Sequence, residues 1–196
     1  MALVILAHPD IEHSIANKTI TRELQHKLPD LEVRDIFQLN PDHKINIQEE
    51  QAALLRHDLI ILQYPMYWYN TPAILKSWFD QVFTYQFAYG SKGDKLKGKS
   101  LLPSLTVGQP EQNFKHDENT ALIENLLTPI KKSVEYTQMH YLAPVILYGI
   151  STVLGYTEPE IINKAKNHSK QLEDIIKAWP KKIIPKGMDN KPQHRK

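Results

Sequence analysis

The segment from His8 to Asn17 carries side chains that suit a phosphate monoester. It reads His8-Pro9-Asp10-Ile11-Glu12-His13-Ser14-Ile15-Ala16-Asn17 and follows an apolar run. Ser14 is a favourable N-cap, so a helix should begin after it and point the free N–H groups of its first turn at a ligand. The alternative, in which Ser14 only caps the helix and His8 only ends a strand, is equally consistent with the sequence.

A second segment is rich in aromatic residues and bounded by prolines: Tyr64-Pro65-Met66-Tyr67-Trp68-Tyr69-Asn70-Thr71-Pro72. Prolines favour extended, exposed backbone, which makes this a poor core segment but a good platform for a flat ring. Stacking on aromatic side chains contributes about 1–3 kcal/mol per ring in nucleic-acid complexes. A packed aromatic cluster beneath a loop is the alternative.

The third segment is Thr106-Val107-Gly108-Gln109-Pro110-Glu111. A glycine at position 108 lets backbone amides approach a ligand closely. Amide donors beside a ring carbonyl would stabilise the negative charge of a reduced flavin, by the same electrostatics as an oxyanion hole. By itself this pattern is not specific.

Strands that alternate with helices are expected to position the three segments. Apolar runs predict strands at Ala2–Ala7, Leu31–Phe37, Asp58–Gln63, Ser100–Val107 and Met139–Leu147. Helical spacing and capping signals predict helices at 15–28, Ile47–Arg56, Pro72–Phe83, Glu118–Val134 and Thr157–Ala178. This alternation predicts an α/β fold: a five-stranded parallel sheet of flavodoxin-like order 2-1-3-4-5, with helices on both faces. All three segments then lie at the carboxyl ends of strands, where ligands bind in such sheets.

Composition excludes several classes of protein. The 196 residues include no cysteine, which excludes disulfides, thiolate zinc sites and iron–sulfur clusters. The net charge of +2 argues against a nucleic-acid partner, and the nine histidines show no metal-ligand spacing. The longest apolar stretch, Leu142–Tyr156, is interrupted and too short for a membrane span, and the first residues lack a signal-peptide pattern. We therefore expect a cytoplasmic protein.

One apparent motif is rejected. Gly93-Asp94-Lys95-Leu96-Lys97-Gly98-Lys99-Ser100 matches the phosphate-loop pattern. That loop works only between a strand and a following helix, because backbone amides and the helix dipole must converge on phosphate. Here Ser100 opens a predicted strand, so the segment is expected to be a basic turn.

The central segments resemble the NAD(P)H:quinone oxidoreductase family of the flavodoxin-like fold. The resemblance rests on Pro65-x-x-Trp68-Tyr69-x-x-Pro72-Ala73-x-Leu75-Lys76-x-Trp78-x-Asp80-x-Val82-Phe83, on Phe87-Ala88-Tyr89-Gly90, and on His8-Pro9 with Ser14-x-x-Asn17. It covers about residues 2–178. The chain is most similar to bacterial NAD(P)H oxidoreductases that include ancillary subunits of glutathione-gated potassium-efflux systems.

The resemblance implies a cofactor site for FMN, with FAD as the alternative, and NAD(P)H as co-substrate. The phosphate and ribityl would lie against His8, Ser14, Ile15, Ala16 and Asn17. The flavin ring would lie against Pro65, Met66, Tyr67, Trp68 and Tyr69, and its pyrimidine edge against Thr106, Val107, Gly108 and Gln109. Phe114 and Tyr89 would contact the substrate. The chain departs from the family at two places. The family often has Thr-Thr-Gly-Gly where this chain has Thr106-Val107-Gly108-Gln109, and mammalian relatives have a tyrosine where this chain has Phe114.

The function implied is a ping-pong transfer of hydride from NAD(P)H through flavin N5 to a quinone or similar acceptor, by a homodimer. Two alternatives stay open: an ancillary subunit docked on a potassium-efflux protein at the inner face of the membrane, and a flavodoxin-type electron carrier. The latter class is usually strongly acidic, unlike this chain. We expect one flavin-binding domain at 1–179 and a basic, disordered tail at 180–196.

Overall fold

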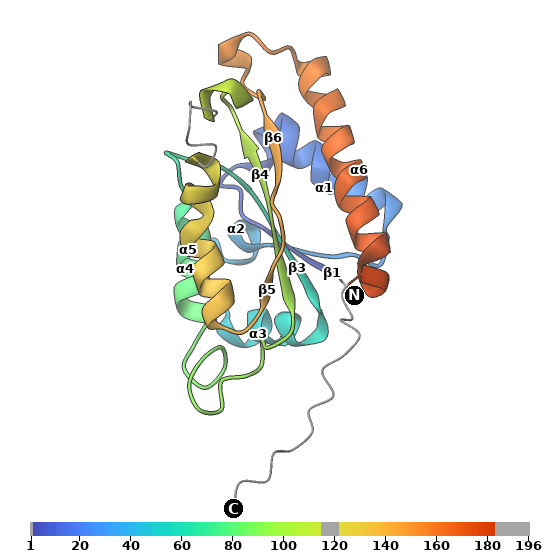
Figure 1. The fold of residues 1–196 in the computed structure, drawn as a ribbon. Coiled ribbons are helices and arrows are strands. Elements are labelled where there is room, and N and C mark those ends of the chain that lie inside the picture. Colours follow the sequence, from blue (N-terminus) through green and yellow to red (C-terminus); the bar gives the residue numbers. More distant parts are fainter. Residues whose placement is uncertain (1, 115–121, 183–196) are drawn as a thin grey trace, which may run out of the picture.

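The computed structural model describes residues 2–114 and 122–182, and within them one sheet forms the centre of the molecule (Figure 1). The strands run in the order β2-β1-β3-β4-β5, all neighbours are parallel, and β6 pairs with β4 beyond the end of β5. Their bounds are β1 (Ala2–Leu6), β2 (Glu32–Asp35), β3 (Leu59–Pro65), β4 (Ser100–Val107), β5 (His140–Tyr141) and β6 (Val145–Tyr148). The predicted flavodoxin-like order is confirmed.

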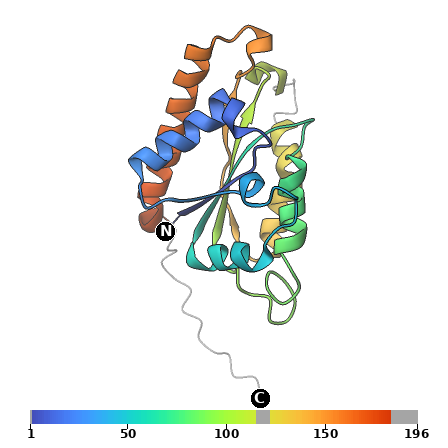
Figure 2. The same cartoon turned by 180° about the vertical axis from the view of Figure 1, so that it is seen from behind.

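Helices cover both faces of the sheet (Figures 1 and 2). On one face lie α1 (Ile15–Lys27) and α6 (Glu158–Lys182); on the other lie α2 (Ile36–Leu39), α3 (Ile47–Arg56), α4 (Ala73–Val82) and α5 (Leu122–Tyr136). Three short 3-10 helices, η1 (Ile11–His13), η2 (Glu111–Phe114) and η3 (Thr152–Leu154), complete the described elements.

The strand sequences explain this layering. Every residue of β1, β3 and β4 is buried, so these strands are apolar on both faces rather than alternating. Ile60 and Leu62 pack with α3, α4 and α5, whereas Leu59 and Ile61 pack with α1 and α6. Gln63 follows in the second series and so faces α1 and α6, which matters below.

The structure corrects the fifth predicted strand. The run Met139–Leu147 forms two short strands, β5 and β6, which pair with the beginning and the end of β4. Pro144 lies between them and has no N–H to donate to a ladder, which accounts for the interruption. The sheet of the described residues therefore has six strands rather than five.

Smaller differences occur at element ends. The predicted strand Leu31–Phe37 stops at Asp35, whose carboxylate accepts hydrogen bonds from the N–H groups of Phe37 and Gln38 and begins α2 instead. Pro72 is the N-cap of α4 rather than its first residue, and α6 continues to Lys182, beyond the predicted Ala178. Ser100 opens β4, as the rejection of the phosphate-loop motif required. Most of the predicted tail, from residue 183, lies outside the described residues.

In the part of the chain that the structure describes, no helix has the length and apolarity to cross a membrane. Within the same residues, no three His, Asp or Glu side chains gather in a way that could hold a metal ion.

Candidate functional site

The three predicted segments meet at the carboxyl edge of the sheet. The N–H of Ala7 donates to Gln63 O at 2.9 Å, which joins the ends of β1 and β3. The N–H of Met66 donates to Thr106 O at 2.8 Å, and Asn17 Nδ2 donates to Thr106 Oγ1 at 2.9 Å. The first, second and third segments are thus linked by direct hydrogen bonds.

Ser14 caps α1 and keeps a proton to donate. Its Oγ accepts hydrogen bonds from Asn17 N at 3.1 Å and Asn17 Nδ2 at 3.3 Å. The first backbone bond of the helix runs from Lys18 N to Ser14 O, so the N–H groups of Ile15 and Ala16 precede the helical ladder. A capped helix start of this kind binds anions readily. Ser14 can therefore cap the helix and also bind a ligand, because its oxygen accepts the capping hydrogen bonds while its O–H group remains free to donate.

His8 is a second donor at this edge. The ring is 8% exposed, and its Nδ1 accepts a hydrogen bond from Asp10 N at 3.0 Å. Burial lowers the pKa of His8 below its usual value, which favours the neutral ring. Because Nδ1 is an acceptor, the proton of that neutral ring lies on Nε2. The edge of the ring packs against Tyr67, with 6.5 Å between ring centroids.

The aromatic segment forms a tight, exposed hairpin. Tyr67 and Asn70 exchange two backbone hydrogen bonds of 2.9 Å, and the two residues at the tip have positive φ angles, 49° for Trp68 and 61° for Tyr69. Such turns normally carry Asn-Gly, because other residues are strained there at a cost of about 1–3 kcal/mol each. Trp68 is 94% exposed, so burial within this chain does not offset the strain. The packed-cluster alternative is wrong for this residue.

A cleft of about 420 Å³ lies beside the hairpin. It is lined by Met66, Trp68, Tyr69, Val107, Gly108, Gln109, Phe114, Ser151, Val153 and Leu154. A Cβ at Gly108 would lie 3.4 Å from Ser151 Cβ, in ordinary van der Waals contact, so these two lining residues are neighbours. The ring of Phe114 lies between those of Tyr69 and Tyr148, at centroid distances of 6.4 and 5.6 Å.

The departure at Gln109 has a visible structural consequence. The carbonyl of Gln109 accepts a hydrogen bond from Gly149 N at 2.9 Å, and its side-chain oxygen accepts one from Asn113 Nδ2 at 2.7 Å. These bonds tie the third segment to the end of β6 and to η2. Contacts with the neighbouring segments therefore hold this loop in place.

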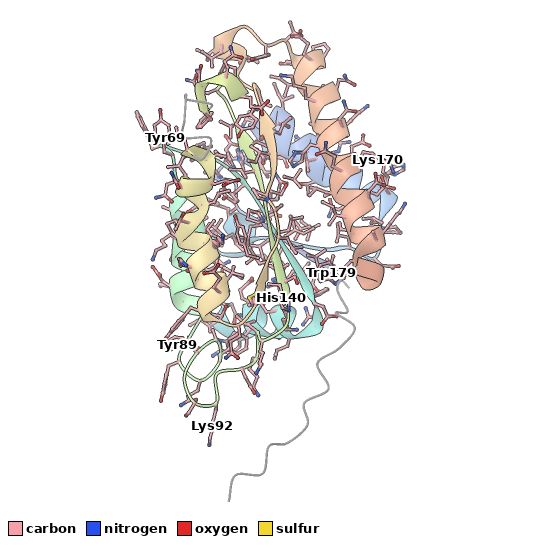
Figure 3. The ribbon with its side chains drawn as sticks, in the orientation of Figure 1. Tyr69, Tyr89, Lys92, His140, Lys170 and Trp179 are labelled. Atoms are coloured by element: carbon pink, nitrogen blue, oxygen red, sulfur yellow. The ribbon has the colours of Figure 1, made fainter. Side chains whose placement is uncertain are left out.

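Tyr89 is not part of this cleft in the single chain. Figure 3 shows Tyr69 and Tyr89 at opposite ends of the molecule. The Tyr89 ring contacts Tyr85 and Tyr136, at centroid distances of 5.8 and 5.9 Å, and Tyr136 is the last residue of α5. Within one chain Tyr89 therefore lies apart from Phe114, and the contact of Tyr89 with a substrate stays a prediction. The chain reaches Tyr89 after α4 has carried it from the carboxyl edge to the amino edge of the sheet.

Two sets of residues at the site were missed by the sequence analysis. The first is the wall formed by Ser151, Val153 and Leu154, which follows the last strand and carries no motif. The second is a buried polar chain behind Asn17, formed by Gln63, Ser104 and His168. The signal for it in the sequence was the presence of Gln63 and Ser104 in otherwise apolar runs, whereas His168 lies among polar residues and gave no signal.

Comparison with known proteins agrees with this geometry. Residues 1–172 match the model of a family described as having a flavodoxin-like fold. The uncharacterized NAD(P)H oxidoreductase YdeQ of Bacillus subtilis (strain 168) is 36% identical over 174 residues, covering 88% of this chain and 86% of YdeQ. KefF of Enterobacter sp. (strain 638), an ancillary protein of a glutathione-regulated potassium-efflux system, is 40% identical over 148 residues, covering 76% of this chain and 83% of KefF.

Two solved structures are also similar. General stress protein 14 of Treponema denticola, solved in complex with FMN, has a TM-score of 0.79 and 28% identity, covering 89% of this chain and 98% of that one. An NADPH-quinone reductase from P. pentosaceus has a TM-score of 0.70 and 25% identity, covering 87% and 96%. The chain therefore belongs to the flavodoxin-like family that includes the NAD(P)H oxidoreductases, and the family predicted from the motifs is confirmed.

The residues at this edge fit a planar ring that carries a phosphate. The start of α1 offers backbone N–H groups, the Ser14 hydroxyl and the His8 ring as donors. The hairpin offers exposed aromatic faces, and Gly108 lines the cleft beside them. No carboxylate is among the residues that line the described cleft.

Proposed function

We propose that this protein is an FMN-dependent NAD(P)H oxidoreductase that passes two electrons to a quinone or a similar acceptor in a ping-pong order. The observation that carries the proposal is the strained Trp68–Tyr69 turn, which exposes a tryptophan almost completely beside a cleft. Strained residues persist where function requires their position. An exposed aromatic face next to open space is what a flat ring needs.

The donors near α1 would hold the phosphate. The N–H groups of Ile15 and Ala16, the Ser14 O–H and the His8 Nε2–H all belong to one strand-to-helix connection. Two of these groups are backbone amides at a helix start, where the helix dipole favours negative charge. This end of the site therefore binds and orients the cofactor.

When bound, FMN supplies the hydride chemistry at its N5 atom. The protein would support that chemistry by position and electrostatics. Val107, Gly108 and Gln109 line the cleft, and their backbone N–H groups would stabilise negative charge on a ring oxygen there. Phe114 has no hydroxyl, so this side chain excludes water from the cleft and carries no proton.

The supply and the removal of electrons would use the same exposed ring face. With the flavin ring against the aromatic tip, where Trp68 and Tyr69 are 94% and 58% exposed, the other face of the flavin would stay open to a second planar molecule. A nicotinamide and a quinone are both planar, so one position serves them in turn. A ping-pong order follows from a shared position, because the first product must leave before the acceptor binds.

We also propose a homodimer. Tyr85, Tyr89 and Tyr136 form an exposed aromatic group at the amino edge of the sheet, with exposures of 63%, 38% and 71%. Aromatic residues are enriched in protein interfaces. If Tyr89 takes part in substrate binding, it does so in the site of a second copy. Light scattering of the purified chain measures the mass in solution.

A second candidate function is supported by the identity of 40% to KefF. In that case the chain would act as an ancillary subunit of a potassium-efflux protein, at the inner face of the membrane. Affinity purification from detergent-solubilised cells separates the two functions. Recovery of a channel protein with the chain supports this role, and quinone reduction by the chain alone supports the free enzyme.

The absorbance spectrum of the untreated purified protein tests the main proposal. We expect a flavin spectrum, release of FMN identified by mass, and NADPH oxidation that depends on a quinone. Apoprotein prepared by acid precipitation should quench the fluorescence of added FMN. A colourless protein that does not bind added FMN would overturn the proposal.

A further inference from the structure

A chain of buried polar side chains runs from α6 to the start of α1. His168 Nε2 lies 2.8 Å from Ser104 Oγ, and Ser104 Oγ donates to Gln63 Oε1 at 2.7 Å. Gln63 Nε2 donates to Asn17 Oδ1 at 2.8 Å, and Asn17 Nδ2 reaches Thr106 and Ser14. His168, Ser104, Gln63 and Asn17 are at most 3% exposed. Gln63 and Ser104 are register partners on adjacent strands, so the sheet itself holds the middle of the chain.

The hydrogen bonds of this chain all point one way. A serine hydroxyl has one proton, and Ser104 gives it to Gln63. The 2.8 Å contact with His168 therefore requires the ring to donate, with its proton on Nε2. Each amide then accepts through oxygen on the His168 side and donates through nitrogen on the Ser14 side.

The direction of these hydrogen bonds decides whether the Ser14 hydroxyl can donate a hydrogen bond to a ligand. Ser14 Oγ accepts hydrogen bonds from the backbone and side-chain nitrogens of Asn17, so its proton is left for a partner outside this chain of hydrogen bonds. If both amides were reversed, Asn17 Oδ1 would face Ser14 and take that proton. In the reversed direction Ser104 Oγ accepts from Gln63 and its own proton is free for His168 Nε2, an arrangement that places the ring proton on Nδ1. The tautomer of a buried ring and the donor character of the site are thus coupled through four hydrogen bonds.

We propose that His168 is a positioning residue, which sets the direction of this hydrogen-bond chain so that Ser14 presents a donor to the cofactor's phosphate. The inference rests on the proposed function in one respect only, the identity of the ligand. A phosphate dianion has only acceptor oxygens, so the observed direction suits it and the reversed direction opposes it. Riboflavin has the same ring and no phosphate, which makes it the matched ligand for a comparison.

Nitrogen-15 NMR of the His168 ring in the whole chain tests the direction itself. Burial lowers the pKa of His168 to about 4, so at pH 7 the ring is neutral and has one proton. We expect that proton on Nε2, in the apoprotein and after FMN is added. A proton on Nδ1 would overturn the proposal. This measurement needs no activity and stands even if the wild type fails to bind FMN, which would refute only the proposed function.

Binding measurements test the consequence. In His168→Leu we expect roughly tenfold weaker FMN binding, the value of one hydrogen bond to a charged group, and a change in riboflavin binding of less than about threefold. His168→Gln places an amide nitrogen where Nε2 was and should restore most of the FMN affinity. Ser169→Ala, which removes a buried hydroxyl next in sequence on α6, is the control and should bind both ligands as the wild type does.

Two outcomes would contradict the role of His168. Equal weakening of FMN and riboflavin in His168→Leu would show a general effect on folding rather than on phosphate recognition. Unchanged FMN binding in the folded fraction of that variant would show that the chain has no influence on Ser14. In a Ser14→Ala background, His168→Leu should have no further effect on FMN affinity, because the hydroxyl that it positions is gone.

Discussion

Two buried polar clusters among the described residues lie on opposite faces of the sheet, and they differ in whether a hydrogen-bond donor is left without a partner. On the face of α3 and α4, Glu50 accepts hydrogen bonds from Arg34 Nε at 2.9 Å, from a terminal nitrogen of Arg34 at 2.7 Å and from Trp78 Nε1 at 2.9 Å. Glu50 is 1% exposed and Trp78 is fully buried. On the face of α1 and α6, uncharged side chains connect His168 to Ser14.

The two clusters show how a polar network that only stabilises the fold differs from one that also serves a binding site. Both oxygens of Glu50 are bound by groups of the same chain, so that cluster is closed. The chain from His168 ends at a half-buried hydroxyl that still has a proton to give. Buried polar groups are normally satisfied, and a spare donor at the end of a buried hydrogen-bond chain, on the carboxyl edge of the sheet, therefore points to a ligand. We expect substitutions to affect stability at the first cluster and binding at the second.

The largest predicted effect belongs to the closed cluster. Glu50→Ala leaves the Arg34 guanidinium and the Trp78 N–H without their acceptor, and we expect the free energy of unfolding to fall by about 3–5 kcal/mol, since breaking a buried pair leaves a charge uncompensated. Urea denaturation measures the change. Glu49→Ala, on the exposed side of α3, is the control and should change stability little. Weakened FMN binding by the folded Glu50→Ala protein would break the distinction between the clusters.

The second prediction concerns pH and the open cluster. The pKa of His168 is about 4 in the fold, below the reference value of 6.5, because the buried ring is costly to charge. The unfolded chain therefore binds this proton first, and stability is lost as the pH falls from about 6.5 to about 4, by up to about 3 kcal/mol. His168→Gln should flatten this slope in a series of denaturation curves. The pKa of His8 is also lowered, so the His168→Gln variant should keep the smaller part of the pH dependence that His8 causes.

The third prediction separates binding from folding at the hairpin. Trp68→Ala removes an exposed ring at a strained position, so we expect FMN binding to weaken by about 1–3 kcal/mol while the free energy of unfolding stays unchanged. Fluorescence quenching and urea denaturation measure the two quantities on the same protein. Leu55→Ala shortens a side chain of α3 that is 50% exposed and lies outside the site and the proposed interface, so it should leave FMN binding unchanged. Equal losses of binding and stability in Trp68→Ala would favour a packing role.

The sequence was sufficient for the order of the sheet and for the three segments of the site. Continuous apolar runs marked the buried parallel strands, and capping residues marked the start of α1. The division of the last predicted strand into β5 and β6 could also have been predicted, because Pro144 has no N–H to donate to a strand ladder. The position of Tyr89 was also within reach, because a helix returns the chain to the amino edge in this fold.

The open cluster could not be derived in the same way. Gln63, Ser104 and His168 are separated by 41 and 64 residues. Gln63 and Ser104 lie in apolar runs, whereas His168 lies among other polar residues of α6. Their meeting depends on the register of β3 with β4 and on the way α6 packs across them. Neither property is encoded in local spacing. The strain at Trp68 was likewise hidden, since the aromatic pattern predicts exposure and says nothing about φ.

The smallest predicted effect sharpens the comparison with a third kind of buried polar group. Tyr64 is 1% exposed, on the face of the closed cluster, and its hydroxyl has no hydrogen-bond partner among the described residues. An unsatisfied buried hydroxyl is unfavourable, so Tyr64→Phe should raise the free energy of unfolding by up to about 1 kcal/mol and leave FMN affinity unchanged. A clear loss of stability in urea would mean that the Tyr64 hydroxyl has a hydrogen-bond partner, and that the polar groups on this face extend beyond the closed cluster.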